Sequence, residues 1–237
     1  MTVTNYTPTD WYSGAGSKTV SSVTWVNGDV IIVRGSVGST STTLNTPTVQ
    51  GGTGTGLTFT LRADEDDGDT GGGRTHVYIW TAKATGTGDG NIRATRSGGD
   101  GWGFAVTKLS GGTWGDYASS NTSAGIDADF SLTTAVDDWV GVIYSDWNAV
   151  SATGFTGQTD GSATISTSVN EGDDAVQGVY LFRADEGSTV AETANYGLSS
   201  YTGLLSVGAG IVVTYSAPAG GSAPPRRPNA INAMIVR

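Results

Sequence analysis

The sequence predicts an all-β protein built as an antiparallel β-sandwich of jelly-roll type, and three observations lead to this fold class. Apolar residues recur with a period of two in short runs, which is the spacing of residues on one face of a strand. Gly, Asn and Asp bound these runs, and the chain contains 37 glycines, as expected when many strands are joined by tight turns. Segments with the 3.6-residue apolar period of an amphipathic helix are scarce.

Ten segments carry the strand pattern, and the strongest features lie at the start of the series. The continuous apolar run at residues 30–33 favours a strand that is buried on both faces near the centre of the sandwich. Asn27-Gly28 is a favoured hairpin pair and predicts a tight turn that pairs the strands on either side. The expected strands are residues 19–25, 29–35, 57–63, 76–83, 91–96, 103–109, 138–145, 177–184, 192–198 and 210–216.

The two halves of the chain resemble each other, which indicates a pseudo-repeat. Residues 77–80 match residues 179–182, residues 103–107 resemble residues 210–214, and residues 28–33 echo residues 137–142, all in the same chain order. Two similar sets of strands would pack either as the two sheets of one sandwich or as two small sandwiches.

The composition changes after residue 216, and we therefore divide the chain into a β-sandwich domain (residues 1–216) and a linker with an extended arm (residues 217–237). The linker is rich in Pro, Gly and Ser, and the prolines beyond it favour an extended backbone. We expect the arm to dock on a neighbouring subunit through Pro224, Pro225, Arg226, Arg227, Pro228, Ile231, Met234, Ile235 and Val236.

The charge and residue usage exclude several classes of protein. A formal net charge of −10 disfavours binding to nucleic acid and to anionic membrane surfaces. Cysteine is absent, which removes disulfides, thiolate catalysis and sulfur-ligated metals. The N-terminus lacks the pattern of a signal peptide, and no apolar run approaches the roughly 20 residues of a membrane helix. We expect synthesis in a cytoplasm and no membrane insertion.

The sequence offers little support for catalysis or for a cofactor. His76 is the single histidine and begins a predicted strand, where a role in strand packing is more common than a catalytic one. An acidic cluster could supply oxygen ligands to Ca²⁺, although its spacing departs from that of a helix-loop-helix calcium site and a solvated acidic loop is the simpler interpretation. The candidate calcium ligands are Asp64, Asp66, Asp67 and Asp69. We expect no enzyme activity and no other cofactor.

The aromatic residues divide into two groups by their surroundings. Trp25, Trp80 and Trp139 fall within apolar runs and are predicted to be buried. A second group lies near Gly, Ser, Asn and Asp, where exposure in loops and contact with a glycan or a protein are expected. This group is Trp102, Trp114, Tyr117 and Trp147.

A further set of segments carries a likeness to a known group of proteins, namely residues 25–33, 44–47, 56–60, 77–80, 90–95 and their echoes in the second half. In these segments the chain resembles Gly- and Thr-rich β-sandwich proteins among the virion structural proteins of tailed bacteriophages. The resemblance implies a non-enzymatic minor tail, tail-tip or capsid-decoration protein of the virion, which would contact other virion proteins and form a homo-oligomer. The alternative is a carbohydrate-binding, lectin-like module for host-surface glycans.

Overall fold

The computed structural model contains strands and connecting segments, with no helix among the described residues. It describes residues 2–7, 9, 12–13, 16–38, 44–54, 56–66, 75–96, 101–111, 113–125, 130–146, 156–159, 165–173, 178–185, 190–199 and 206–216. For β2, β10 and β13–β15 it describes the backbone alone. The strands are β1 (Thr2–Asn5), β2 (Tyr12–Ser13), β3 (Gly16–Trp25), β4 (Val30–Gly38), β5 (Thr48–Gln50), β6 (Thr60–Asp66), β7 (Thr75–Lys83), β8 (Gly88–Arg96), β9 (Gly101–Ser110), β10 (Thr113–Gly125), β11 (Phe130–Thr134), β12 (Trp139–Asp146), β13 (Thr156–Thr159), β14 (Ile165–Asp173), β15 (Gly178–Asp185), β16 (Glu192–Ser199) and β17 (Ser206–Ser216).

These strands form four antiparallel sheets whose strand orders repeat. In the first half, β1-β9-β4-β7-β6 form a large sheet, with β2 also paired to β9, and β3-β8-β5 form a small one. In the second half, β10-β17-β12-β15-β14 and β11-β16-β13 have the same orders. The pseudo-repeat is therefore confirmed, and we call residues 2–110 the first repeat and residues 113–216 the second repeat. In each repeat the chain passes back and forth between its two sheets, and its first and last strands pair, as in a jelly roll.

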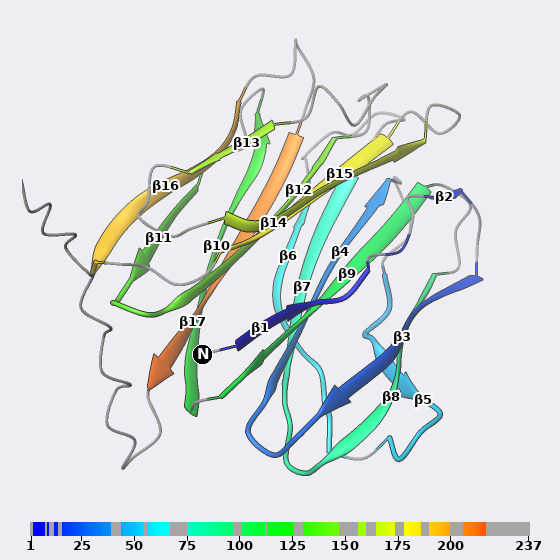
Figure 1. Cartoon of the computed structure of the whole chain (residues 1–237). Helices are drawn as coiled ribbons and strands as arrows, with labels where there is room; N and C mark the ends of the chain where they lie inside the picture. Colours follow the sequence, from blue (N-terminus) through cyan, green and yellow to red (C-terminus); the bar gives the residue numbers. More distant parts are fainter. Residues whose placement is uncertain are drawn as a thin grey trace, which may run out of the picture.

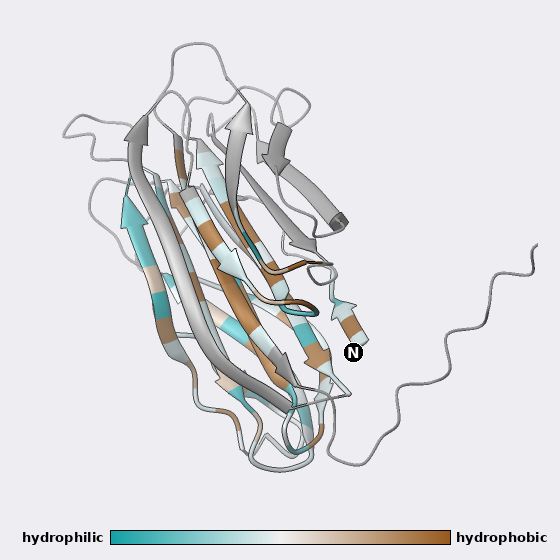
Figure 2. Cartoon of the chain, turned by 90° about the vertical axis from the view of Figure 1, so that its left-hand side faces the viewer, coloured by the Kyte–Doolittle hydropathy of each residue, from teal (hydrophilic) through white to brown (hydrophobic). Residues whose placement is uncertain are grey.

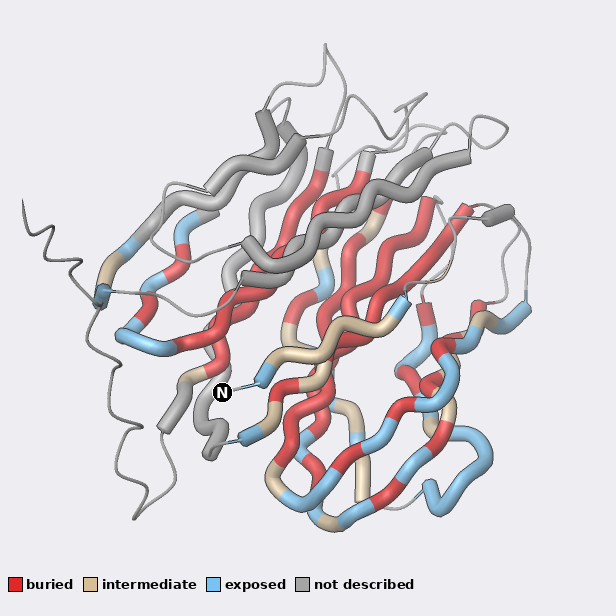
Figure 3. The backbone as a smooth tube through the Cα atoms, viewed as in Figure 1, coloured by how far each residue is buried: buried red, intermediate tan, exposed pale blue. Residues whose placement is uncertain are grey.

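The four sheets are stacked as layers, with the two large sheets in the middle (Figure 1). One buried cluster joins Val30 and Ile79 of the first large sheet to Trp139 and Ile211 of the second. A second buried cluster fills the space between the first large sheet and its small sheet. Hydrophobic residues accordingly line the described strands of the middle layers (Figure 2), and burial is most complete there (Figure 3). Of the two arrangements that the sequence left open, the structure has two sandwiches joined through their large sheets.

Strand β4 lies at the centre of this arrangement, and every one of its residues is buried. Val30, Ile31, Ile32 and Val33 are each 0% exposed, because one face of β4 packs on the second repeat and the other on β3, β5 and β8. The predicted burial on both faces is confirmed. The predicted burial of Trp25, Trp80 and Trp139 is confirmed as well.

The hairpin predicted at Asn27-Gly28 is wrong, although the turn itself is present. Gly28 has a φ of 91°, and the Asp29 amide donates to the Val26 carbonyl oxygen at 3.0 Å. However, β3 pairs with β8, whereas both edges of β4 are occupied by β7 and β9. The turn therefore carries the chain from one sheet of the sandwich to the other.

The same turn occurs at the equivalent place in the second repeat. The Val26 amide donates to Asp29 Oδ2 at 3.0 Å, and the Ala135 amide donates to Asp138 Oδ2 at 2.8 Å. This match confirms the equivalence of residues 28–33 with residues 137–142.

The other two sequence alignments of the repeats are shifted. Val33 pairs with Val106 and Trp80, while its equivalent Val142 pairs with Gly210 and Arg183. Val106 thus corresponds to Gly210 and not to Val213, and Trp80 corresponds to Arg183 and not to Phe182. The sequence alignment matched similar residue types, whereas spatial equivalence is defined by the residues paired on neighbouring strands.

Candidate functional site

Trp102, which was predicted to be exposed in a loop, is buried. It lies in β9 opposite Val37, is 1% exposed, and belongs to the core between the two sheets of the first repeat. Lys18 covers this region, with its Nζ atom 5.1 Å from the centre of the Trp102 ring and donating to the Trp102 carbonyl oxygen at 2.6 Å. The predicted exposure of Trp102, on which its contact with a glycan depended, is therefore wrong. Gly101 and Gly103, which flank it, are strand residues here and do not mark a loop.

The structure describes the other three aromatic candidates only in part or not at all. The backbones of Trp114 and Tyr117 lie in β10 and pair with Tyr215 and Val213 of β17, so these positions are in a strand and not in a loop. Their side chains, and the whole of Trp147, lie outside the described residues. The arm, residues 217–237, also lies outside the described residues.

The acidic candidates begin in a strand. Strand β6 continues through Asp66, so Asp64 and Asp66 are strand residues, which corrects the loop predicted from residue 64 onward. Asp67 and Asp69 lie outside the described residues. Among the residues that the structure describes, no group of three or more His, Cys, Asp or Glu side chains is placed to hold a metal ion.

Asp66 instead begins a chain of polar contacts along one side of β6 and β7. Its Oδ2 atom lies 3.2 Å from His76 Nε2, and His76 Nδ1 lies 2.9 Å from the Tyr78 hydroxyl. The Tyr78 ring stacks on Trp80 with a centroid separation of 5.2 Å. Burial and, secondarily, the Asp64 carboxylate raise the pKa of Tyr78, so its phenol stays neutral.

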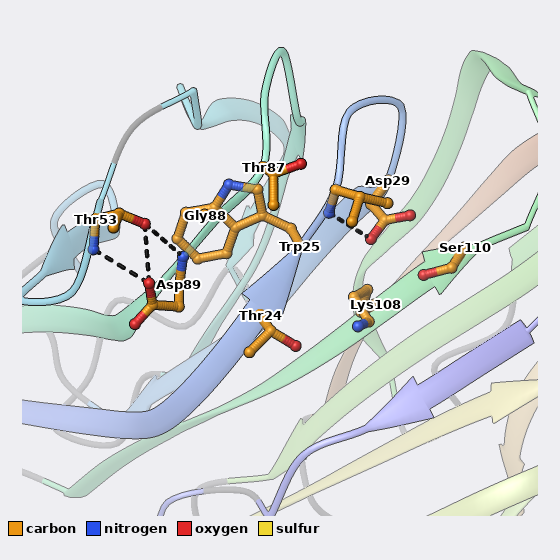
Figure 4. A pocket seen from close by; sticks show the side chains of 10 residues that line it. Thr24, Trp25, Asp29, Thr53, Thr87, Gly88, Asp89, Lys108 and Ser110 are labelled. Atoms are coloured by element: carbon orange, nitrogen blue, oxygen red, sulfur yellow. Dashed lines mark hydrogen bonds between the residues drawn. The ribbon is translucent and has the colours of Figure 1, made fainter.

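A pocket lies elsewhere, at the mouth of the first sandwich between β3, β8 and β9 (Figure 4). Its volume is about 590 Å³, within the roughly 300–1,000 Å³ typical of ligand sites. Two other pockets, one beside β5 and one between the segment after β1 and the middle of β3, are smaller, at about 370 and 360 Å³. The large pocket is lined by Thr24, Trp25, Val26, Asp29, Thr53, Thr87, Gly88, Asp89, Lys108 and Ser110.

The wall of this pocket is held rigidly by Trp25 and Asp89. The Trp25 indole packs directly on the backbone at Gly88, where an added Cβ would lie 2.9 Å from the ring. Asp89 Oδ1 accepts hydrogen bonds from the Thr53 amide at 3.3 Å and from the Thr53 hydroxyl at 2.9 Å. The Asp89 amide in turn donates to the Thr53 hydroxyl at 3.2 Å. These bonds join the loop after β5 to the start of β8.

Lys108 and Ser110 form the opposite wall. They are two residues apart on β9 and therefore share a face. The Ser110 Oγ atom is buried and has no hydrogen-bond partner among the described residues. No described carboxylate lies within ion-pair distance of Lys108. The residues that line the pocket thus include one ammonium, carboxylates and several hydroxyls, next to the apolar surface of Trp25 and Val26.

Sequence reasoning missed this pocket because its residues come from separate segments. Asp29 follows the predicted turn, but Thr53, Asp89, Lys108 and Ser110 have no local pattern that joins them. Only the pairing of β3 with β8, and the position of β9 beside them, bring the segments together.

Comparison with known proteins gives no further guide to function. No protein-family model, curated protein or solved structure matches the chain. In the part of the chain that the structure describes, no helix has the length and apolar character needed to span a membrane.

Proposed function

We propose that this protein is a non-enzymatic structural component of a tailed-phage virion, either a minor tail or tail-tip protein or a capsid-decoration protein. In this proposal its strands form a rigid body, and residues 217–237 attach that body to copies of itself and to other virion proteins. The sequence resemblance described above supports this role.

The observation that carries the proposal is the way in which two jelly rolls are joined. Jelly rolls are common in viral capsid proteins. Here the two large sheets bury an apolar cluster between them, so the repeats are fused by a core and not connected by a linker. Arg34, which is 0% exposed, reaches across this core and donates to the Val142 carbonyl oxygen at 3.2 Å. Such a body resists deformation, which is what a particle component needs.

The polar contacts near His76 give less support to an enzyme. Catalysis by the single histidine would require a nucleophile or a substrate pocket beside its ring. In the described part of the chain, the neighbours of His76 are Asp66 and Tyr78, and this trio lines none of the three pockets described above. We therefore assign these contacts to the packing of β6 on β7.

Charge favours attachment through the arm. Residues 217–237 contain three arginines and no acidic residue, whereas the whole chain has a net charge of −10. Strand β6 is an edge of the first large sheet and carries Asp64, Glu65 and Asp66. An extended basic segment from a neighbouring copy could pair with such an edge by strand addition, and the opposite charges would favour the encounter.

The test compares the full chain with a version that ends at Gly221. Light scattering across a concentration series measures the solution mass of both. The proposal expects oligomers of the full chain that the truncated chain does not form. Arg226→Glu with Arg227→Glu should weaken association in the same direction, because the reversed charges would repel the acidic body, while Arg226→Lys with Arg227→Lys serves as the matched control.

A second measurement addresses the virion directly. Mass spectrometry of purified particles from a phage that encodes this chain should detect it at a fixed ratio to the major virion proteins. Its absence from purified particles would contradict the proposal, whatever the oligomeric state of the isolated protein.

A further inference from the structure

We propose that the pocket between β3, β8 and β9 binds a neutral polyhydroxylated ligand, a saccharide unit, through Asp89, Lys108 and Ser110. This assignment does not depend on a role in a virion. It rests on the unmatched polar groups of the pocket, on its charge, and on the differences between the two repeats.

The first argument is the unmatched hydrogen-bonding capacity of one wall. Ser110 Oγ is buried without a hydrogen-bond partner among the described residues, and a buried hydroxyl of this kind carries an energetic cost that a bound group can remove. Lys108 lies two residues away on the same face of β9 and supplies ammonium donors. A ligand hydroxyl between them can accept from Lys108 and exchange a hydrogen bond with Ser110.

The second argument is that the opposite wall is fixed before a ligand arrives. Thr53 donates twice to Asp89 Oδ1, and the Asp89 amide donates back to Thr53. A carboxylate has further lone pairs that accept from donors. Since the Asp89 side chain is already ordered, binding does not have to restrict its conformation.

The charge of the pocket decides between ligand classes. Asp29 and Asp89 stand against the single cation Lys108, so a phosphate group would be repelled. A divalent cation is disfavoured by Lys108, and the described residues contain no metal-ligating group of three. Trp25 is only 1% exposed and its ring cannot serve as a stacking platform. A neutral ligand whose hydroxyls both donate and accept matches all of these groups.

The second repeat provides an internal comparison. The pair Thr24–Asp89 corresponds to Thr133–Thr193, so Thr193 replaces the carboxylate. There the two hydroxyls lie 2.8 Å apart and bond to each other.

On the β9 side, polar character is lost at one of the two positions. The pair Ile31–Lys108 corresponds to Val140–Val212, so a valine stands in place of the ammonium, and Thr214 stands in place of Ser110. The turn residues Asp29 and Asp138, which support the fold, are the same in both repeats. The carboxylate of Asp89 and the ammonium of Lys108 are therefore specific to the first repeat, whereas Thr214 retains the hydroxyl of Ser110.

The experiment is saturation-transfer NMR on the full chain with millimolar methyl glucoside, methyl galactoside, methyl mannoside and N-acetylglucosamine as probes. Glucose 6-phosphate and Ca²⁺ serve as comparison ligands. We expect transfer from at least one neutral sugar and weaker binding of the phosphorylated one. Free glucose is compared with methyl glucoside in the same way. A methyl glycoside mimics a glycan-linked unit, so preference for methyl glucoside over free glucose would identify a glycan as the source.

The variants Lys108→Met and Ser110→Ala should each weaken binding by about tenfold, as expected for the loss of a hydrogen bond from a charged or buried group. Thr214→Ala, at the equivalent position of the second repeat, should leave binding unchanged. Thermal unfolding confirms that each variant is folded, and Lys108→Gln replaces Lys108→Met if the latter is not.

Three results would overturn the assignment: no transfer from any neutral probe, unchanged affinity in the folded Lys108 and Ser110 variants, or tighter binding of glucose 6-phosphate than of the neutral sugars. Because the chain that ends at Gly221 keeps this pocket, its sugar binding separates failure of this assignment from failure of arm-driven assembly.

Discussion

Ser36 and Ser145 occupy equivalent positions in the two repeats, and the Ser36 hydroxyl donates to the Ser145 hydroxyl with an Oγ–Oγ distance of 2.5 Å. A residue that contacts its own equivalent must lie close to a two-fold axis, as in the interface of a symmetric dimer. The two large sheets therefore face each other about a pseudo-two-fold axis that passes near this pair. Thr75 also hydrogen bonds to Ser145, so the contact is part of a small buried network.

Replacement of these serines should reveal coupling between the repeats. Ser145→Ala leaves the buried hydroxyls of Ser36 and Thr75 without this partner and should lower the free energy of unfolding by about 1–3 kcal/mol. Ser36→Ala should cost less, about 1 kcal/mol, because Ser145 keeps its bond to Thr75. Urea unfolding of both single variants and the double variant measures the coupling energy, which should be at least about 0.5 kcal/mol.

The exposed Ser17→Ala on β3 is the control and should change stability by no more than about 0.5 kcal/mol. Strictly additive effects of Ser36→Ala and Ser145→Ala would contradict a direct bond between the repeats.

Among the charged residues between the two large sheets, Arg34 should be the one whose replacement lowers the free energy of unfolding most. Besides its bond to Val142, its guanidinium donates to Thr107 Oγ1 at 2.6 Å and lies 5.5 Å from the centre of the Trp139 ring. Arg34→Ala removes these contacts and leaves a cavity, so we expect a loss of about 3 kcal/mol or more in urea unfolding. Arg34→Met retains most of the volume and should cost clearly less.

The half-buried Arg93, on β8, provides the matched control for Arg34. Its guanidinium donates to the Gln50 side chain at 3.2 Å in an exposed setting, and Arg93→Ala should cost less than about 1 kcal/mol. Equal effects of Arg34→Ala and Arg93→Ala would show that the repeats do not depend on the buried guanidinium.

Strands with a strong apolar pattern could be predicted from the sequence, whereas polar strands could not. Residues 30–33 and 77–80 alternate or cluster apolar side chains because they face cores on one or both sides. Strand β10 (Thr113–Gly125) contains several Gly, Ala, Asp and Asn residues, which have weak strand preference, and it becomes a strand through its pairing with β17. Tertiary pairing there overrides local propensity.

The turn at Gly28 illustrates the second limit. Its local geometry followed from the Asn-Gly pair, but the choice of β8 as the partner of β3 depends on strands far along the chain. The candidate pocket has the same origin, because Asp89 and Lys108 meet only after β8 and β9 have taken their places. Sequence pattern alone does not show which residues of separate strands will line the same pocket.

The two equivalent turns predict opposite outcomes for two substitutions. Gly28 has a φ of 91° with open space where a Cβ would lie, and Asp137 has a φ of 71° at the matching position. Gly28→Ala should lower the free energy of unfolding by roughly 1–2 kcal/mol, because a side chain disfavours this left-handed backbone. Asp137→Gly should raise it by up to about 1 kcal/mol in thermal or urea unfolding.

Asp137→Asn separates charge from backbone conformation at this turn, since Asn tolerates the same φ. We expect it to change stability little, and Asp137→Ala to be destabilising. Stabilisation by Asn equal to that by Gly would assign the effect to charge and contradict the conformational explanation.

Tyr78 predicts how stability changes at high pH. Burial and the Asp64 carboxylate raise the pKa of Tyr78 above its ordinary value of 10.0, so above that pH the unfolded chain loses a proton that the folded chain retains. Unfolding then releases a proton, and the free energy of unfolding falls by up to about 1.4 kcal/mol per pH unit; below pH 10 the contribution is fully present. Urea unfolding at a series of pH values should show a steeper loss for the wild type than for Tyr78→Phe, which has no phenol to ionise. Parallel slopes for the two proteins would mean that Tyr78 ionises in the folded chain as readily as in the unfolded one, and that its neutral hydroxyl beside His76 is not maintained by the fold.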